Sequence, residues 1–430
     1  MRDKLAKLIS VFKKDGIKKA TGKVLRYAKG FIKSHMGLAY RIDFKKHRDG
    51  YLELIKEATR DTERVLIWRS SFGWDVPLFQ RPQHIARAMA RTGSTVFYEV
   101  TPMTDDVKGI KKAENGLYLV NFQNKHLSEL LLTELDGFSG PKYLQFYSTD
   151  WTMSVDYVNS FIKRGYKILY EYIDDLSPKL AGTKELPVNV REKYEAAMSD
   201  SENYFMVTTA DLLFEDAKNR RGQRRLCFST NGVDYGFFRD TSDEVTFDGD
   251  FMKVLETGKP LVGYYGAMAE WFDYDLIKMI DSTDRFSVVL FGIRYDDSLD
   301  RSGILDLKNV FFMGPRNYDV LKYYASKIDI LTIPFVINDI TKATSPLKLF
   351  EYMALHKPIV TSAMNECMKY RSAMIGHNAD EFISLLDTAL EKAKDPEYIA
   401  LLDREARENS WSAKAEIITE MLASAEKEDG

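Results

Sequence analysis

From about residue 62 onward, the sequence alternates short β-rich runs with longer stretches of helical periodicity. The runs RVLIWRS (64–70), STVFYEV (94–100) and YLQFYST (143–149) are examples, and RPQHIARAMART (81–92) has the spacing of an amphipathic helix. Repeated strand–helix units of this kind are typical of parallel sheets covered by helices. The pattern therefore predicts an α/β protein.

The alternation occurs in two blocks, and 430 residues exceed the size of one typical domain. We expect one Rossmann-like domain over residues 61–230 and a second over 259–404. The mixed, charged stretch 231–258 is predicted to connect them. A helical tail over 405–430 is predicted to cross back and complete the first domain, and residues 1–60 form a basic helical extension.

Three predicted strands of the second block end in glycine: LVGYYG (261–266), FSVVLFG (286–292) and NVFFMG (309–314). Glycine lets the backbone turn sharply and lets a ligand approach closely. In open α/β sheets, ligands bind beyond the carboxyl ends of the strands. Two such domains facing each other would therefore place a binding site in the cleft between them.

Charge is concentrated at the start of the chain. Residues 1–50 contain 15 Lys or Arg and four Asp, so they carry +11 within a chain of net charge −3. Apolar residues recur through this stretch, which predicts helices with one apolar and one lysine-rich face. Two interpretations stay open: the helices bind an anionic membrane surface, or they are solvated or packed on the protein.

The composition predicts where in the cell the protein works. The chain has only two cysteines, and it shows neither a signal-peptide pattern nor a run of about 18 apolar residues. We therefore expect a cytoplasmic protein, with association at the inner face of the plasma membrane as a further possibility. The small net charge argues against a nucleic-acid partner. The six histidines show no ligand spacing, so no metal site is expected.

Several segments together resemble one family, the GT-B glycosyltransferases, and within it the retaining enzymes related to glycogen synthase and to bacterial surface-polysaccharide synthesis. The resemblance runs from about residue 64 to 415. It is carried by WDVPLFQRPQH (74–84), YEYIDDLSP (170–178), STNGVD (229–234), VGYYGAMAEWFDY (262–274), NVFFMGPRNYDVLKYYASKIDILTIPF (309–335) and SPLKLFEYMALHKPIVTSAMNE (345–366).

The resemblance implies a two-domain enzyme whose domains face each other across a cleft. It implies transfer of a sugar from a nucleotide diphosphate sugar, with a UDP-sugar as the expected donor, to a glycan or lipid-linked acceptor. Retention of configuration, independence of metal and the absence of any further cofactor are also implied by it.

The segment 345–356 contains residue types that suit a nucleotide sugar. Ser345 and Pro346 are predicted to start a helix, with Ser345 as N-cap, and a helix N-terminus binds phosphate. Lys348 is our candidate to balance the diphosphate charge. The resemblance assigns Glu351 to the ribose hydroxyls. The alternative is an ordinary surface ion pair between Lys348 and Glu351.

Three further residues are expected at the donor. Gly266 and Ala267 should bring the loop after the first strand of the second domain against the phosphates. Arg316 is a candidate to stack on the base, with an ordinary solvated arginine as the alternative. Two positions depart from the family pattern. Thr344 stands where many relatives carry a glutamate, and the loop GAMAEWFDY lacks a cation, for which Lys348, Arg316, Lys342 or Arg294 are the candidate replacements.

Asp174 and Asp175 end an apolar strand of the first domain and are the predicted catalytic pair. One of them is placed to act as a base toward an acceptor hydroxyl. The alternative is that one of them caps the next helix.

Acceptor binding is expected from the segment that follows the first strand. It contributes Trp74 for stacking on a sugar ring, with Asp75 and Gln80 beside it, and Arg81 for an anionic group. The alternative for Trp74 is a place in the hydrophobic core. Two other functions remain open: a GT-B-shaped accessory protein without catalysis, or a nucleotide-sugar epimerase.

Overall fold

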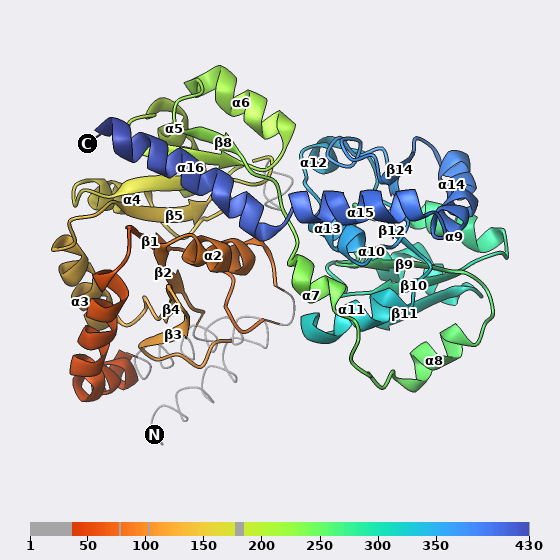
Figure 1. Cartoon of the computed structure of the whole chain (residues 1–430), viewed down its shortest axis with the longest axis horizontal. Helices are drawn as coiled ribbons and strands as arrows, with labels where there is room; N and C mark the ends of the chain where they lie inside the picture. Colours follow the sequence, from red (N-terminus) through yellow and green to blue (C-terminus); the bar gives the residue numbers. More distant parts are fainter. Residues whose placement is uncertain (1–36, 77–78, 102–103, 177–184, 430) are drawn as a thin grey trace, which may run out of the picture.

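The computed structural model describes residues 37–76, 79–101, 104–176 and 185–429, and Figure 1 shows two domains side by side. Most of the basic segment 1–50 lies outside the described residues, so its proposed contact with a membrane does too. None of the helices in the described ranges is long and apolar enough to cross a bilayer.

The first domain is built on an eight-stranded sheet in the order β3-β4-β2-β1-β5-β6-β7-β8, and every pair is parallel except β3–β4. Its strands are β1 (Arg64–Trp68), β2 (Ser94–Glu99), β3 (Ile110–Glu114), β4 (Leu117–Val120), β5 (Lys142–Tyr147), β6 (Lys167–Tyr172), β7 (Tyr204–Thr208) and β8 (Leu226–Phe228). Its helices are α2 (Arg81–Arg91), α3 (Lys125–Asp136), α4 (Val155–Ile162), α5 (Val188–Ser199) and α6 (Asp211–Arg221).

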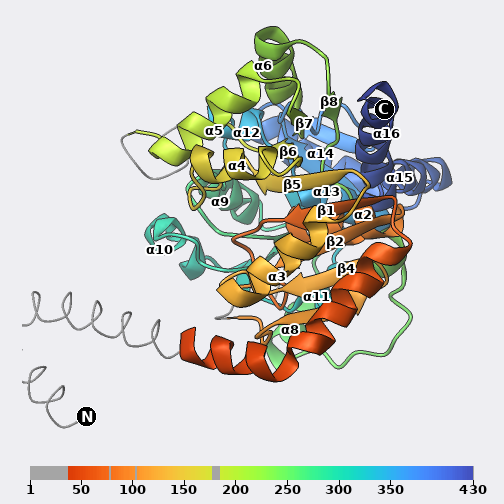
Figure 2. The same cartoon turned by 90° about the vertical axis from the view of Figure 1, so that its left-hand side faces the viewer.

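Alternate residues of this sheet face two separate cores. In β1, Val65 and Ile67 pack into one core, while Leu66 and Trp68 pack into the other, because successive side chains of a strand point to opposite faces. A helix over residues 37–60 adds Ile55 to the first of these cores. In Figure 2 this helix runs along the lower edge of the domain.

The second domain has a six-stranded parallel sheet in the order β11-β10-β9-β12-β13-β14. Its strands are β9 (Leu261–Tyr265), β10 (Ser287–Phe291), β11 (Val310–Gly314), β12 (Ile330–Ile333), β13 (Ile359–Ser362) and β14 (Ala373–Gly376). Its helices are α7 (Tyr235–Arg239), α8 (Gly249–Leu255), α9 (Tyr274–Ser282), α10 (Ser298–Ser302), the 3-10 turn η1 (Ile304–Asp306), α11 (Tyr318–Ser326), α12 (Asp339–Lys342), α13 (Leu347–Ala354), α14 (Ala379–Lys392) and α15 (Pro396–Glu408).

The expected connection 231–258 is part of the second domain. Phe238 of α7 and Phe251 and Val254 of α8 are buried in the same core as β9 and β10. The sequence suggested a linker because these apolar residues are separated by charged ones, and their burial follows from packing that the local pattern does not encode.

The C-terminal helix α16 (Trp411–Asp429) crosses back over the first domain, as predicted (Figure 1). It buries Trp411, Ile418 and Leu422 beside α2. The helix that crosses back begins at Trp411 and not at residue 405. The preceding helix, α15, extends to Glu408 and packs Leu402 and Ala406 into the core of the second domain.

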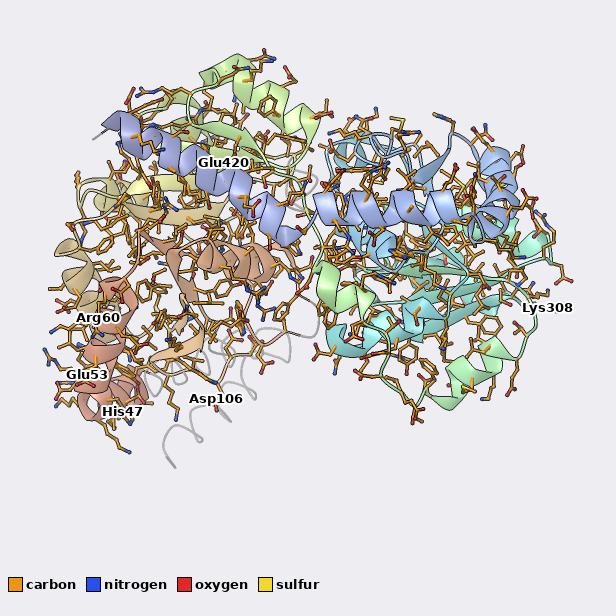
Figure 3. All side chains as sticks on the ribbon, viewed as in Figure 1. His47, Glu53, Arg60, Asp106, Lys308 and Glu420 are labelled. Carbon is orange, nitrogen blue, oxygen red and sulfur yellow. The ribbon has the colours of Figure 1, made fainter. Side chains whose placement is uncertain are left out.

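Two strands, β3 and β14, were not expected. Strand β3 has the polar sequence IKKAE and lies at the sheet edge, where exposed lysines are common because they discourage pairing with another chain. Strand β14 is only four residues long, and its partner β13 supplies the register. Figure 3 shows the polar residues His47, Glu53 and Arg60 on the outer edge of the first domain, away from the second.

Candidate active site between the two domains

Loops that follow strands of both sheets meet at the junction of the domains. The ring of Tyr318, at the start of α11, lies 5.8 Å from that of Phe79 and 5.5 Å from that of His84 in the first domain. The carboxylate of Glu366, after β13, accepts a 2.8 Å hydrogen bond from the backbone N–H of Asp211, the first residue of α6. The carboxyl ends of the two sheets therefore face one another.

The three strand-end glycines predicted from the sequence lie side by side. The N–H of Gly266 donates to Phe291 O at 2.9 Å, and the N–H of Gly292 donates to Gly314 O at 3.0 Å. Gly266 has φ +150° and Gly292 has φ +149°, and a Cβ on Gly292 would overlap the carbonyl oxygen of Gly266. Glycine at these positions is thus required by close backbone packing.

Lys348 lies against the first of these turns. A Cβ on Gly266 would be 3.1 Å from Lys348 Cε. The ammonium group sits over the rings of Tyr264 and Phe335, 5.4 and 5.2 Å from their centroids. The side chain is half-buried, and burial lowers the pKa of Lys348 to about 8, although Glu351 opposes the shift.

Glu351 is three residues further along α13 and only 2% exposed. Burial raises its pKa to about 7, and the neighbouring Tyr265 hydroxyl and the Lys348 ammonium oppose this shift only in part. The Glu351 charge also acts on Tyr318 at the junction. Within the described part of the chain neither Lys348 nor Glu351 forms a salt bridge, so the alternative of a surface ion pair is wrong.

The start of this helix differs from the prediction. Helix α13 begins at Leu347, Pro346 occupies the N-cap position, and no side chain caps the helix. The hydroxyl of Ser345 is buried without a hydrogen-bond partner among the described residues, and the Ser345 carbonyl accepts a 2.7 Å bond from Asn231 Nδ2. Because no side chain caps the helix, the N–H groups of Leu347 and Lys348 stay free to bind an anion, whereas the N–H of Leu349 donates to the Pro346 carbonyl at 3.1 Å.

Arg316 is not available to a base. Its guanidinium donates to Asp248 at 2.6 Å and to the carbonyl of Met313 at 2.6 Å, and it stacks over the ring of Tyr324. Asp248 also caps α8, which explains why this acidic residue lies beside Arg316. Ala267, in contrast, is half-buried in the turn after β9, as expected, and its carbonyl accepts a hydrogen bond from Tyr264.

The other candidate cations are also paired. Arg294 pairs with Asp300, and exposed Lys342 lies 3.7 Å from Asp339. Of the four candidate cations, Lys348 is therefore the one that lies beside the turn at Gly266 and has no carboxylate partner among the described residues.

Asp174 and Asp175 follow β6 and are half-buried. Burial, reinforced by the charge of Asp175, raises the pKa of Asp174 to about 6. Burial and then the charge of Asp339, on α12 of the second domain, raise the pKa of Asp175. Neither residue caps a described helix, because the next one, α5, has Pro187 at its N-cap.

Asp175 also lines a cavity of about 350 Å³ between the domains. The cavity has side chains from both domains, so it belongs to the junction. Its lining comprises Tyr172, Asp175, Tyr194, Leu212, Leu213, Asp216, Asp339, Lys342 and Ala343.

Arg81, expected at the acceptor, has a structural role instead. It is 5% exposed, its Nε donates to Glu171 at 2.6 Å, and its Nη1 donates to the carbonyl of Thr230 at 2.9 Å. Glu171 is fully buried and also accepts from Gln145. The sequence concealed this pair because its members are 90 residues apart.

The other three acceptor candidates differ in their surroundings. Trp74 is half-buried against Tyr98 and Phe79, so it lies in a ring cluster. Gln80 forms a capping box at the start of α2. Asp75 is exposed, and acceptor binding by its carboxylate stays a prediction.

Residues that sequence reasoning missed include Tyr265 and Tyr318, which flank Glu351, and Trp151, an exposed indole after β5. Their signal is weak in the sequence, because aromatic residues at strand ends are as common in cores. Among the described residues, no cluster of three His, Cys, Asp or Glu side chains is arranged to bind a metal. Independence of metal remains a prediction.

No protein-family model matches the chain. It is 24% identical over 204 residues to a Bacillus subtilis (strain 168) protein named "Putative teichuronic acid biosynthesis glycosyltransferase TuaH". The match covers 46% of this chain and 50% of the relative, so the chain spans about half the length of the curated relative that it matches.

Two solved structures share the architecture over most of both chains. Sucrose-phosphate synthase from Thermosynechococcus elongatus has a TM-score of 0.58 at 14% identity, covering 85% of this chain and 99% of its own. Anabaena HepE, solved with UDP and glucose, has a TM-score of 0.53 at 14% identity, covering 84% and 100%. The chain thus has the two-domain GT-B fold of these proteins, which confirms the fold expected from its sequence.

Proposed function

We propose that this protein is a glycosyltransferase of polysaccharide biosynthesis that transfers a sugar from a nucleotide diphosphate sugar to a glycan or lipid-linked acceptor. One observation carries the proposal: Lys348 and buried Glu351 extend from the uncapped start of α13, against Gly266, at the junction of two Rossmann-like domains. The curated relative supports the polysaccharide context by its name.

In this proposal the diphosphate lies at the first turn of α13. The free N–H groups there and the helix dipole favour a phosphate. Lys348 balances the charge that develops on the leaving phosphate, which is an effective form of transition-state stabilisation in a water-poor site. Ionised Glu351 accepts hydrogen bonds from the two ribose hydroxyls, since a carboxylate has room for both.

The donor is expected to be a UDP-sugar, as HepE was solved with UDP and glucose. Asp174, with a pKa of about 6, is largely ionised at neutral pH and is suited to accept a proton from an acceptor hydroxyl. We further propose that the anomeric configuration is retained and that no metal is required. Proton NMR of the product anomer and activity in a chelating buffer test these two points.

The function is tested by incubating the full chain with UDP-, GDP- and dTDP-sugars, each with and without a mixture of glycan and lipid-linked acceptors, and measuring the acceptor-dependent release of the nucleoside diphosphate. We expect turnover with at least one UDP-sugar and a loss of about 10²–10³-fold in kcat for Lys348→Met. Lys308→Met, an exposed lysine at the far edge of the second domain (Figure 3), is the control. Absence of turnover with every donor contradicts the proposal and favours a non-catalytic accessory protein, and an intact nucleotide sugar with an altered sugar indicates an epimerase.

A further inference from the structure

We propose that Trp151 is a stacking platform for a pyranose ring of the acceptor, an inference that rests on the proposed glycosyltransferase function. Trp151 is 66% exposed, more than any other large apolar side chain of the described residues. Its indole ring is not stacked on any described aromatic ring. A large apolar ring in this state indicates a surface that is covered by a ligand.

The position of Trp151 suits an acceptor. It follows β5, which pairs in parallel with β6, the strand that leads to Asp174 and Asp175. The two strand ends are joined by a 3.3 Å hydrogen bond from the N–H of Ile173 to the hydroxyl of Ser148. A ring that stacks on Trp151 would therefore lie at the same edge of the sheet as the predicted catalytic carboxylates, beyond the neighbouring strand.

The loop that presents Trp151 is held rigidly from below. Lys193 of α5 is fully buried, and its ammonium donates to Asp150 O at 2.7 Å, Asp150 Oδ1 at 2.8 Å and Met153 O at 2.8 Å. The amide of Asn189 also donates to Trp151 O at 3.1 Å. Burying a lysine ammonium costs free energy unless its hydrogen bonds are all made. The buried Lys193 therefore holds this turn in place through the three bonds that it donates.

A rigid aromatic surface lowers the entropic cost of binding, because no loop has to be ordered when the ligand arrives. The local sequence fits a sugar better than an anionic lipid surface, because residues 148–158 contain no Lys or Arg to attract one. The Asp150 carboxylate is bound by Lys193 and Thr152. The apolar face of a pyranose can therefore cover the indole itself, and the proposal assigns no contact to this carboxylate.

The test uses the full chain labelled with 5-fluorotryptophan and followed by ¹⁹F NMR. The chain has five tryptophans, and Trp151→Phe identifies the resonance of interest. Methyl glycosides of glucose, galactose and N-acetylglucosamine are titrated with UDP present. We expect at least one of them to shift the Trp151 resonance while buried Trp68 stays unmoved as an internal control. Glycerol, which has hydroxyls but no ring, should not shift it.

Two variants test the positioning role. Asn189→Ala, an exposed residue, should weaken binding of the responsive glycoside about threefold, and Lys193→Met should weaken it about tenfold with the indole still present. UDP affinity of Trp151→Phe should equal that of the wild type. A Trp151 resonance that no glycoside moves, or that only anionic vesicles move, overturns the proposal. Failure of UDP to bind would instead contradict the proposed function.

Discussion

Lys348 lies beside Gly266 in the turn that follows β9: a methyl group on Gly266 would be 3.1 Å from Lys348 Cε and 2.6 Å from the Tyr264 hydroxyl. This proximity ties the backbone of one strand end to the position of the ammonium group on α13. In the proposed function, Lys348 supplies from the neighbouring helix the cation that the turn itself lacks.

The first prediction concerns this turn. Gly266→Ala should weaken binding of UDP at least tenfold, because the new Cβ would lie 2.6 Å from the Tyr264 hydroxyl and 3.1 Å from Lys348 Cε, and because the backbone at φ +150° disfavours alanine. Isothermal titration calorimetry measures the effect. Gly303→Ala is the control: Gly303 also has a positive φ, but a Cβ there meets nothing within 4 Å. Equal loss in both variants would mean that backbone strain alone is responsible.

The second prediction concerns the pH dependence of donor binding. Lys348 must be protonated to bind phosphate, so affinity for UDP-glucose should fall as the pH rises through about 8. Glu351 must be ionised to accept from the ribose, so affinity should also fall as the pH drops below about 7. In Lys348→Arg the loss of affinity above pH 8 should disappear, because the guanidinium stays protonated. Calorimetry from pH 5.5 to 9.5 measures these affinities. If the affinity of the wild type for UDP-glucose does not change over this range, the roles assigned to Lys348 and Glu351 are both contradicted.

The third prediction concerns stability. The folded-state pKa of Glu351 is raised from 4.5 to about 7, so the stability associated with the neutral acid is present below pH 4.5 and is lost as the pH rises toward 7. Glu351→Gln should therefore raise the free energy of unfolding by up to about 3 kcal/mol at pH 8 and leave it unchanged at pH 4.

Urea denaturation at the two pH values measures this difference, and the exposed Glu256→Gln serves as control. A variant that is less stable than the wild type at pH 8 would show that ionised Glu351 supports the fold instead of the site. Greater stability together with weaker binding is the expected signature of a functional group.

The fourth prediction concerns the contact between the domains. Helix α6 has no cap from its own domain, since Ala210 precedes it, and Glu366 of the second domain binds its first N–H. Lys369 bridges Glu366 and Asp211 at 2.7 Å each. Glu366→Ala should cost about 1 kcal/mol, as loss of a helix cap does. Hydrogen exchange should become faster in the first turn of α6 but not in α9, whose cap is local.

The sequence was most informative where structure is local. The β-rich runs predicted the strands β1, β2, β9 and β10 to within two residues, and the strand-end glycines located the turn that contacts Lys348. The start of α13 was predicted one residue early, because Ser345 uses its carbonyl for Asn231 and its hydroxyl does not cap.

The site residues that were predicted wrongly form bonds to partners that are distant in the sequence. Arg81 and Arg316 are cations at strand-to-helix junctions, where a ligand site was expected. Each is bound to a carboxylate that is distant in the sequence, Glu171 for Arg81 and Asp248 for Arg316. A single sequence contains no record of such pairs. Trp151 was missed for a similar reason. The loop that carries it is held by the buried Lys193, which is distant in the sequence.

The central claim is that α13 and the Gly266 turn bind a nucleotide diphosphate through Lys348. Calorimetric titration of UDP into the wild type, Lys348→Met and Lys308→Met at pH 7.5 tests it most directly. The account predicts measurable binding by the wild type and Lys308→Met, and at least a tenfold weaker affinity for Lys348→Met. Equal affinity in all three proteins, or no binding by the wild type, would contradict it.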